Sequence, residues 1–74
     1  MANYYTMNQV IIGDTFLDNY RWLITDYCVA CDVDGITIEY QEKDKDGVFV
    51  TKDSINMGEE VAQLLINTLL KFKS

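Results

Sequence analysis

Two Asp-Gly dipeptides, Asp34-Gly35 and Asp46-Gly47, limit how the middle of this 74-residue chain can fold. Asp-Gly supplies the positive φ angles that tight β-hairpin turns require. With the first dipeptide as a two-residue turn, residues 27–42 form a hairpin in which apolar pairs share one face. These pairs are Val33 with Ile36, Cys31 with Ile38, and Val29 with Tyr40. Because a shift of one residue would destroy the match, the pattern predicts this register.

The second dipeptide predicts a further strand from Val48 to Ile55. A two-residue turn gives the pairs Ile38 with Ile55, Ile36 with Met57, and Tyr40 with Asp53. The first two pairs suit a core face, whereas the third places a carboxylate on it. A longer turn, or a bulge near Asp53-Ser54, would resolve the conflict.

The C-terminal segment has the spacing of an amphipathic helix. Asn56 or Gly58 is placed to cap it, and Glu59 and Glu60 stand in its first turn, where the helix dipole favours negative charge. The apolar residues recur at helical spacing over a wide arc: Val61, Leu64, Leu65, Ile66, Leu69, Leu70 and Phe72. So wide an arc predicts a helix that is either deeply buried or in contact with a second surface.

Residues 1–26 are compatible with either a helix or strands. A helical repeat runs through Phe16, Leu17, Tyr20, Leu23, Ile24 and Tyr27. Tyr4–Ile12 ends in β-forming residues, and Arg21–Asp26 could extend the first hairpin strand. The whole chain is expected to be a single α+β domain, residues 1–74. Its core would be an antiparallel meander of three or four strands, packed on one face by the C-terminal helix, with an N-terminal helix as an open alternative.

Histidine is absent, which excludes catalytic and metal sites that depend on it. Cys28 and Cys31 form a CxxC inside the expected first strand. Three residues of strand span about 10 Å and point the two side chains to opposite faces. Because a disulfide needs Cα atoms within about 7 Å, we expect two free thiols, with Cys31 in the core and Cys28 on the outer face.

Residues 42–53 have carboxylates spaced as in a calcium-binding EF-hand loop. They are Glu42, Asp44, Asp46 and Asp53, with Gly47 among them. Strands rather than helices flank this loop, and Lys43 and Lys45 would oppose a cation, so a solvated hairpin turn is expected and weak calcium binding is left open. The pairs Asp32 with Asp34 and Asp44 with Asp46 lie on turns without a partner that would complete a catalytic site. We therefore expect neither an enzyme nor a cofactor.

Acidic side chains outnumber basic ones by 12 to 6, and the net charge is −6. A small chain cannot bury many charges, so its surface field is negative. This field opposes anionic lipid and has the wrong sign for direct contact with DNA or RNA. It favours a basic protein partner, which we expect to be a nucleic-acid-binding protein. No apolar run approaches the roughly 20 residues that span a membrane. The lack of a signal-peptide pattern and the two cysteines favour the cytoplasm.

The expected hairpin register places carboxylates in a band on the sheet face opposite the helix. The residues predicted to bind a partner are Trp22, Asp26, Asp32, Asp34, Glu39, Asp44 and Asp46. In size, acidity and lack of catalytic residues the chain resembles small phage-encoded inhibitors, such as anti-CRISPR proteins and uracil-DNA glycosylase inhibitors, although no motif matches. The resemblance implies a non-enzymatic inhibitor that imitates nucleic acid and blocks the basic groove of a host or defence protein.

The wide apolar arc of the helix favours an alternative function. The chain would then be a small structural or accessory subunit that associates through the apolar helix or a sheet edge, with a homodimer as one form. Binding by charge should weaken with salt. Binding through Ile66 or Leu70 should be insensitive to salt.

Overall fold

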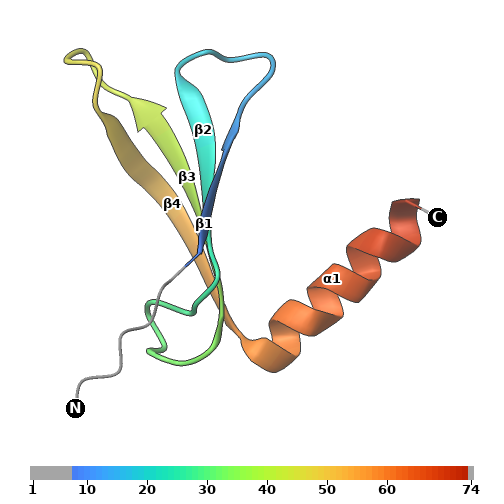
Figure 1. The fold of residues 1–74 in the computed structure, drawn as a ribbon. Coiled ribbons are helices and arrows are strands. Elements are labelled where there is room, and N and C mark those ends of the chain that lie inside the picture. The colour runs from blue at the N-terminus through green and yellow to red at the C-terminus, as the bar shows by residue number, and fades with distance from the viewer. Residues whose placement is uncertain (1–7, 74) are drawn as a thin grey trace.

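The computed structural model describes residues 8–73 as an antiparallel sheet followed by one helix (Figure 1). The elements are β1 Gln9–Gly13, β2 Tyr20–Thr25, β3 Gly35–Lys43, β4 Phe49–Gly58 and α1 Glu59–Lys73. The strands lie in the order β1-β2-β3-β4, so the sheet is a four-stranded meander. This α+β arrangement confirms the predicted fold class. Of the strand expected over Tyr4–Ile12, residues 4–7 lie outside the described residues, and the rest contributes to β1.

The helical repeat between Phe16 and Tyr27 does not produce a helix, and an N-terminal helix in this segment is a wrong prediction. The segment instead forms a loop and β2, which pairs with β1 on one side and β3 on the other. Trp22 lies opposite both Ile12 and Tyr40. Aromatic and β-branched side chains make favourable cross-strand pairs, and pairing on both edges outweighs the local helical spacing.

The hairpin predicted over residues 27–42 is also wrong. β3 pairs with β2 rather than with residues 27–33, so that Ile38 lies opposite Ile24. Residues 26–34 form a loop, and only the bridge between Cys28 and Val33 resembles strand pairing. The positive φ angle in this loop belongs to Asp32, at 57°, and not to Gly35. Aspartate tolerates the left-handed region better than most residues do.

Cys28 and Cys31 form a disulfide within this loop, with their Cα atoms 5.3 Å apart. The prediction of two free thiols is wrong because it assumed an extended strand. Here the Asp32 N–H donates to the Cys28 carbonyl oxygen at 2.8 Å, and this turn brings the two cysteines together. Cys28 is fully buried and Cys31 is exposed, which reverses the expected placement.

The predicted register of β3 and β4 is confirmed. Ile38 lies opposite Ile55, and Tyr40 lies opposite Asp53. The pairing shifts by one residue between Tyr40 and Gln41, where Asp53 and Thr51 are the partners, so Lys52 forms a bulge. The turn is longer than two residues, because the Asp44 N–H donates to the Val48 carbonyl oxygen at 2.8 Å. The register expected from a two-residue turn therefore holds for residues 35–40, and the bulge lies at Lys52 rather than near Asp53-Ser54, so that Asp53 stays on the face of Tyr40.

The Asp44–Val48 segment forms the exposed hairpin turn that was expected. Asp44 Oδ1 accepts hydrogen bonds from the backbone N–H groups of Asp46 and Val48 at 2.8 and 3.0 Å. Gly47 has a φ of 82°, a region that favours glycine. Among residues 8–73, no group of three or more His, Cys, Asp or Glu side chains is placed to hold a metal ion.

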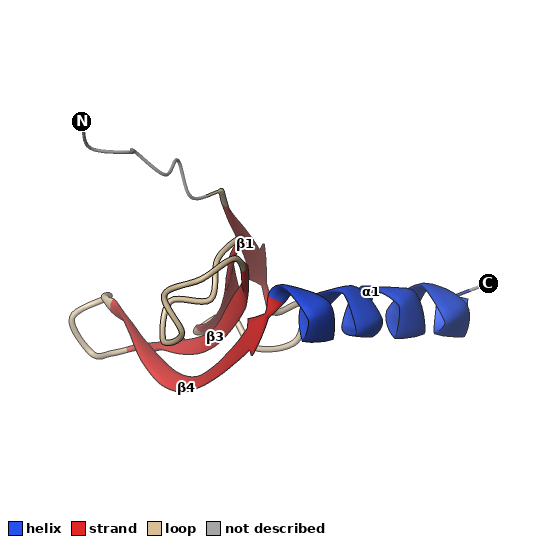
Figure 2. Ribbon diagram, turned by 90° about the horizontal axis from the view of Figure 1, so that it is seen from below, coloured by secondary structure: helices blue, strands red, loops and turns tan. Residues whose placement is uncertain are grey.

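α1 begins directly after β4, with Glu59 and Glu60 in its first turn and Lys71 and Lys73 in its last. The helix contacts β3 and β4 and then extends away from the sheet (Figure 2). Ala62 is its one buried residue, so deep burial, one of the two alternatives that the apolar arc allowed, does not occur. Within residues 8–73 no helix is long and apolar enough to span a membrane.

The interior of the molecule is small. Its buried apolar residues are Cys28 and Ala62, and its buried polar residues are Thr25, Thr37 and Gln41. The radius of gyration is 14.2 Å, whereas a compact domain of this length has a value of about 11 Å. The chain is therefore extended for its size.

Gly35 is required by close packing rather than by turn geometry. A Cβ atom there would overlap the Met57 carbonyl oxygen and lie 3.0 Å from the Cys28 Cβ atom. We expect Gly35→Ala to lower the free energy of unfolding by about 1–3 kcal/mol, since the strand must shift. Urea denaturation at fixed protein concentration measures this. Gly13→Ala is the matched control, because nothing lies within 4 Å of its Cβ position. Equal losses in the two variants would contradict the close approach.

Candidate functional site

The strand register divides the side chains of the sheet between a polar face and an apolar face. Residues directly opposite each other in antiparallel strands share a face, and the faces alternate along each strand. One face is almost wholly apolar, and we call it the apolar face. Its members are Val10, Ile12, Tyr20, Trp22, Ile24, Ile36, Ile38, Tyr40, Val50, Ile55 and Met57, with Glu42 and Asp53 at the end near the β3–β4 turn.

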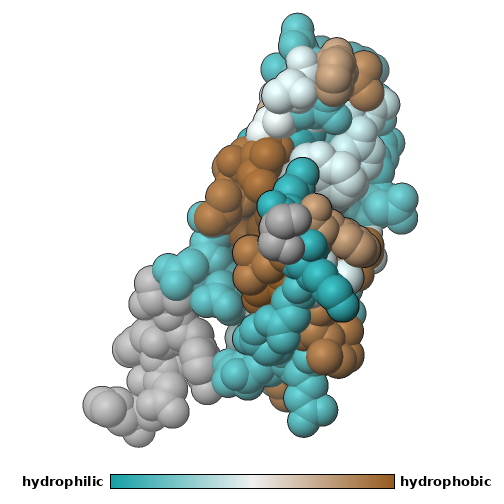
Figure 3. Space-filling model, turned by 90° about the vertical axis from the view of Figure 1, so that its right-hand side faces the viewer, coloured by the Kyte–Doolittle hydropathy of each residue, from teal (hydrophilic) through white to brown (hydrophobic). Residues whose placement is uncertain are grey.

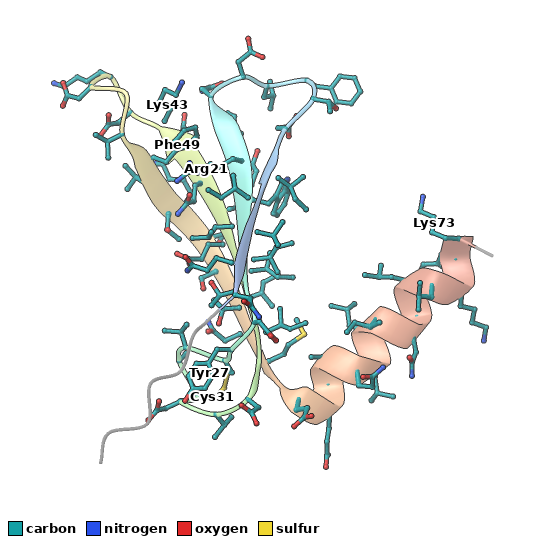
Figure 4. All side chains as sticks on the ribbon, in the orientation of Figure 1. Arg21, Tyr27, Cys31, Lys43, Phe49 and Lys73 are labelled. Atoms are coloured by element: carbon teal, nitrogen blue, oxygen red, sulfur yellow. A yellow bond between two sulfur atoms is a disulfide. The ribbon has the colours of Figure 1, made fainter. Side chains whose placement is uncertain are left out.

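The other face, the polar face, is held by hydrogen bonds between side chains. Arg21 Nε donates to Gln41 Oε1 at 2.7 Å, and Gln41 Nε2 donates to Thr51 Oγ1 at 3.2 Å. Thr51 Oγ1 in turn donates to Glu39 Oε1 at 2.7 Å. The Arg21 guanidinium lies 3.9 Å from the centre of the Phe49 ring, and Figure 4 shows both beside Lys43. These contacts join β2, β3 and β4 without an apolar layer.

The disulfide loop covers the other end of the polar face. Thr37 Oγ1 accepts a hydrogen bond from the Val29 N–H at 2.9 Å and lies 2.7 Å from the Tyr27 carbonyl oxygen. Asn56 Oδ1 accepts from the Ala30 N–H at 3.1 Å. At both ends of the polar face, polar side chains therefore find hydrogen-bond partners within the chain.

The apolar face has no comparable cover. Val10 and Ile55 expose 57% and 56% of their surface, and Ile12 exposes 48%. Near the β3–β4 turn the aromatic rings gather: Trp22 lies 4.4 Å from Tyr40, and Tyr20 stacks on Tyr40 at 5.1 Å, both measured between ring centres. Trp22 remains 39% exposed.

α1 leaves the sheet on the side of the apolar face. Ile36 on that face and Ala62 and Ile66 on the helix line one cavity of about 330 Å³, together with Asp26, Asp34 and Glu59. Beyond this cavity the helix and the sheet diverge, and Lys73 lies far from the strands (Figure 4). Seen from the helix side, apolar surface lies on both sides of α1 and on the sheet behind it (Figure 3).

The exposed side chains of α1 are unusually large and apolar. Leu64, Leu69, Leu70 and Phe72 expose 65%, 53%, 64% and 76% of their surface. The apolar face and the exposed helix residues on the side of Ala62 together form a V-shaped surface, open to solvent between its two arms; these residues are Ile66, Leu69, Leu70 and Phe72, whereas Leu64 lies on the opposite side of the helix. We call this surface the apolar cleft. Exposed apolar patches larger than a few hundred Å² mark interaction sites in proteins.

The structure does not gather the seven residues that were predicted to bind a partner on one face. Trp22 belongs to the apolar face, whereas Glu39 lies on the polar face. Asp26, Asp32 and Asp34 lie in the disulfide loop, and Asp44 and Asp46 in the turn at the opposite end of β3. The expected acidic band across one face is therefore wrong, because it depended on the wrong hairpin register.

Several of these carboxylates have structural roles. Asp32 Oδ1 accepts a hydrogen bond from the Tyr27 hydroxyl at 2.8 Å, and Asp44 caps its turn. Asp26 and Asp34 do lie together, beside Glu59 at the start of α1. The residues of the apolar cleft on β1 and β4 were not predicted as site residues. The over-wide apolar arc of α1 was the sequence signal that pointed to a second surface.

Comparison of the chain with models of known protein families, with curated proteins and with solved structures finds no match.

Glu42 is the main cause of a raised pKa at Tyr20 and a lesser cause at Tyr40. Its carboxylate raises the pKa of Tyr20 by hydrogen bonding and by charge, with desolvation contributing. Desolvation raises the pKa of Tyr40, and the charges of Asp14 and Glu42 add to this. A tyrosine pKa raised by folding means that the folded state keeps its proton longer than the unfolded state. Stability is therefore full below about pH 10 and falls as the pH rises further.

We expect Glu42→Gln to lower the pKa of Tyr20 and, to a smaller extent, that of Tyr40, since both lose a nearby negative charge. NMR titration of the tyrosine ring carbons measures each residue separately. Glu39→Gln is the matched control, because it removes a carboxylate from the opposite face. If both substitutions shifted Tyr20 equally, a general charge effect rather than the Glu42 contact would be responsible.

Proposed function

We propose that this chain is a non-enzymatic protein-binding subunit that works by association through the apolar cleft. One observation supports this proposal above the others: α1 carries six large apolar side chains that are exposed and buries only Ala62. The six are Val61, Leu64, Ile66, Leu69, Leu70 and Phe72. The function corresponds to the accessory-subunit alternative drawn from the sequence.

The free energy available at this surface is large compared with the stability of a small domain. Full burial of a Leu, Ile or Phe side chain contributes about 1.5–3 kcal/mol, and a typical domain is stable by only about 5–15 kcal/mol. A helix of about 15 residues is also marginal in water without packing. A partner that covers α1 would therefore stabilise the helix and bind through it.

Photo-crosslinking at Phe72 tests the proposed function. We expect the full chain, expressed with p-benzoylphenylalanine at position 72, to crosslink to protein in cells, because this side chain is 76% exposed on the apolar cleft. Gel electrophoresis and mass spectrometry identify the product. The same replacement at Phe49, on the polar face beneath Arg21, is the matched control and should give no adduct. Absence of any protein adduct at position 72 would overturn the proposal.

A second function, the inhibitor that binds a basic protein, is supported by the carboxylates at the start of α1. Asp26, Asp34 and Glu59 line one cavity, and Asp34, Glu59 and Glu60 line the next. No lysine or arginine lines either cavity among the described residues. A basic nucleic-acid-binding partner, which this function requires, would meet these carboxylates as it would meet phosphates.

Capture experiments at two salt concentrations test this second function. We expect the immobilised chain to retain a basic nucleic-acid-binding protein from host lysate at low salt and to release it at high salt, because salt screens exposed charges. Asp26→Lys with Asp34→Lys should reduce capture about tenfold, as a loss of about 1.4 kcal/mol would. Asp44→Lys with Asp46→Lys, at the far turn, is the control of equal charge. Capture that is unchanged by salt and by the first pair of substitutions would contradict an acidic binding site.

A further inference from the structure

We propose that the apolar cleft is occupied by a second copy of this chain, with α1 of each copy lying along the apolar face of the other. This inference rests on the proposed function and names its partner. The result is a homodimer with two equivalent helix-on-sheet contacts. Each copy supplies one helix and one sheet face, which is the reciprocity that a two-fold interface requires.

The helix of one copy cannot cover its own sheet. Ala62, in the first turn, is buried to 4% exposure against the sheet, and this contact sets the direction of α1. Because an α-helix is straight, its distance from the sheet grows with every turn beyond Ala62. Leu69 and Phe72 expose more than half of their surface for this reason. Closing α1 onto its own sheet would require the Ala62 contact to break.

The two arms of the cleft match each other in size and chemistry. The 15 residues of α1 extend for about 22 Å. The nine residues of β3 extend for about 30 Å, so one helix fits along the apolar face. A helix packed on one face of an antiparallel sheet is also the common two-layer architecture of small α+β domains. In the described part of each copy no helix covers the apolar face along its length, and the helix of the other copy would supply this second layer.

The exposed area agrees with the size of a dimer interface. The whole chain, of 8.5 kDa, exposes 6038 Å², whereas a compact monomer of that mass exposes about 4700 Å². The excess is roughly 1300 Å² in each copy and is a property of the whole chain, not of the cleft alone. A dimer that covered all of it would bury about 2600 Å² in total, which is an upper limit and lies in the range of obligate homodimers.

Charge favours one direction for the helix on the partner's sheet. Lys71 and Lys73 stand in the last turn of α1. Glu42 and Asp53 stand at the end of the apolar face nearest the β3–β4 turn, and Glu42 Oε1 also lies 3.8 Å from Lys52 Nζ of its own chain, which leaves Asp53 as the main attraction. A helix whose C-terminal end lies over that end of the partner's sheet brings these opposite charges together. The acidic first turn, Glu59 and Glu60, then lies away from the partner's carboxylates.

Sedimentation of the purified full chain tests the dimer. We expect a mass twice that of the 8.5 kDa chain. Ile12→Thr should raise the dissociation constant roughly tenfold or more, because two methyl-rich contacts are lost per dimer. Ile11→Thr is the matched control: the same residue type lies next in β1, is 57% exposed, and points to the polar face. Leu69→Gln should weaken the dimer as Ile12→Thr does, and Leu69 is exposed in the single chain, so its loss does not disturb the fold of one copy.

Crosslink mapping distinguishes helix-on-sheet packing from other dimers. Isotopically labelled and unlabelled chains, both carrying p-benzoylphenylalanine at position 72, are mixed and irradiated. We expect inter-chain adducts on peptides of β1 to β4. Adducts confined to α1 of the other copy would indicate helix–helix pairing and would overturn the proposed packing.

Failure of the dimer can be told apart from failure of the proposed function. A mass of one chain at micromolar concentration, or equal effects of Ile11→Thr and Ile12→Thr, would overturn the homodimer. If position 72 then crosslinks in cells to a different protein, the proposed function holds and only its partner changes. Binding of the purified chain to phosphatidylserine vesicles that Leu69→Gln abolishes would instead assign the cleft to a lipid surface and overturn the inference.

Discussion

A single antiparallel sheet has two faces, and the rest of this structure depends on which of them the chain itself covers. The polar face is satisfied within the chain, by the Arg21–Gln41–Thr51 hydrogen bonds and by the loop that bonds to Thr37. The apolar face receives only the first turns of α1. Because apolar burial is the main favourable term in folding, the uncovered face and helix are the part of the molecule where association gains most.

The disulfide loop explains why the polar face, and not the apolar face, is the covered one. Residues 26–34 turn back at Cys28 and Cys31, and their backbone N–H groups reach Thr37 and Asn56 on the polar face. The Val29 and Ala30 N–H groups find side-chain acceptors there, in Thr37 Oγ1 and Asn56 Oδ1. At the same end of the sheet the apolar face presents Ile24, Ile36 and Met57, which offer no comparable oxygen.

Sequence patterns predicted the elements whose determinants are local or strictly periodic. The β3–β4 register followed from pairing Ile38 with Ile55, and the start of α1 followed from Glu59 and Glu60. The prediction for the β2–β3 connection was wrong. Val29, Cys31 and Val33 alternate as residues of a strand do, but the disulfide and hydrogen bonds to distant residues fold them into a loop. The prediction of an acidic binding face was wrong for the same reason, because it depended on the hairpin predicted over residues 27–42. The wide apolar arc of α1 left deep burial and contact with a second surface as alternatives, and spacing alone could not show that the sheet beside the helix was also uncovered.

Salt should affect a homodimer and a complex with a basic protein in opposite directions. Each copy carries a net charge of −6, so two copies repel each other at long range, and salt weakens this repulsion. A complex with a basic protein would instead lose its attraction as salt rises. Carboxylates spread over loops and turns, rather than gathered in one band, keep the repulsion away from most of the apolar cleft. The acidic surface is thus compatible with a homodimer, because most carboxylates lie outside the contact, and Glu42 and Asp53 lie at one end of the apolar face, where the last turn of the other copy's helix carries lysines.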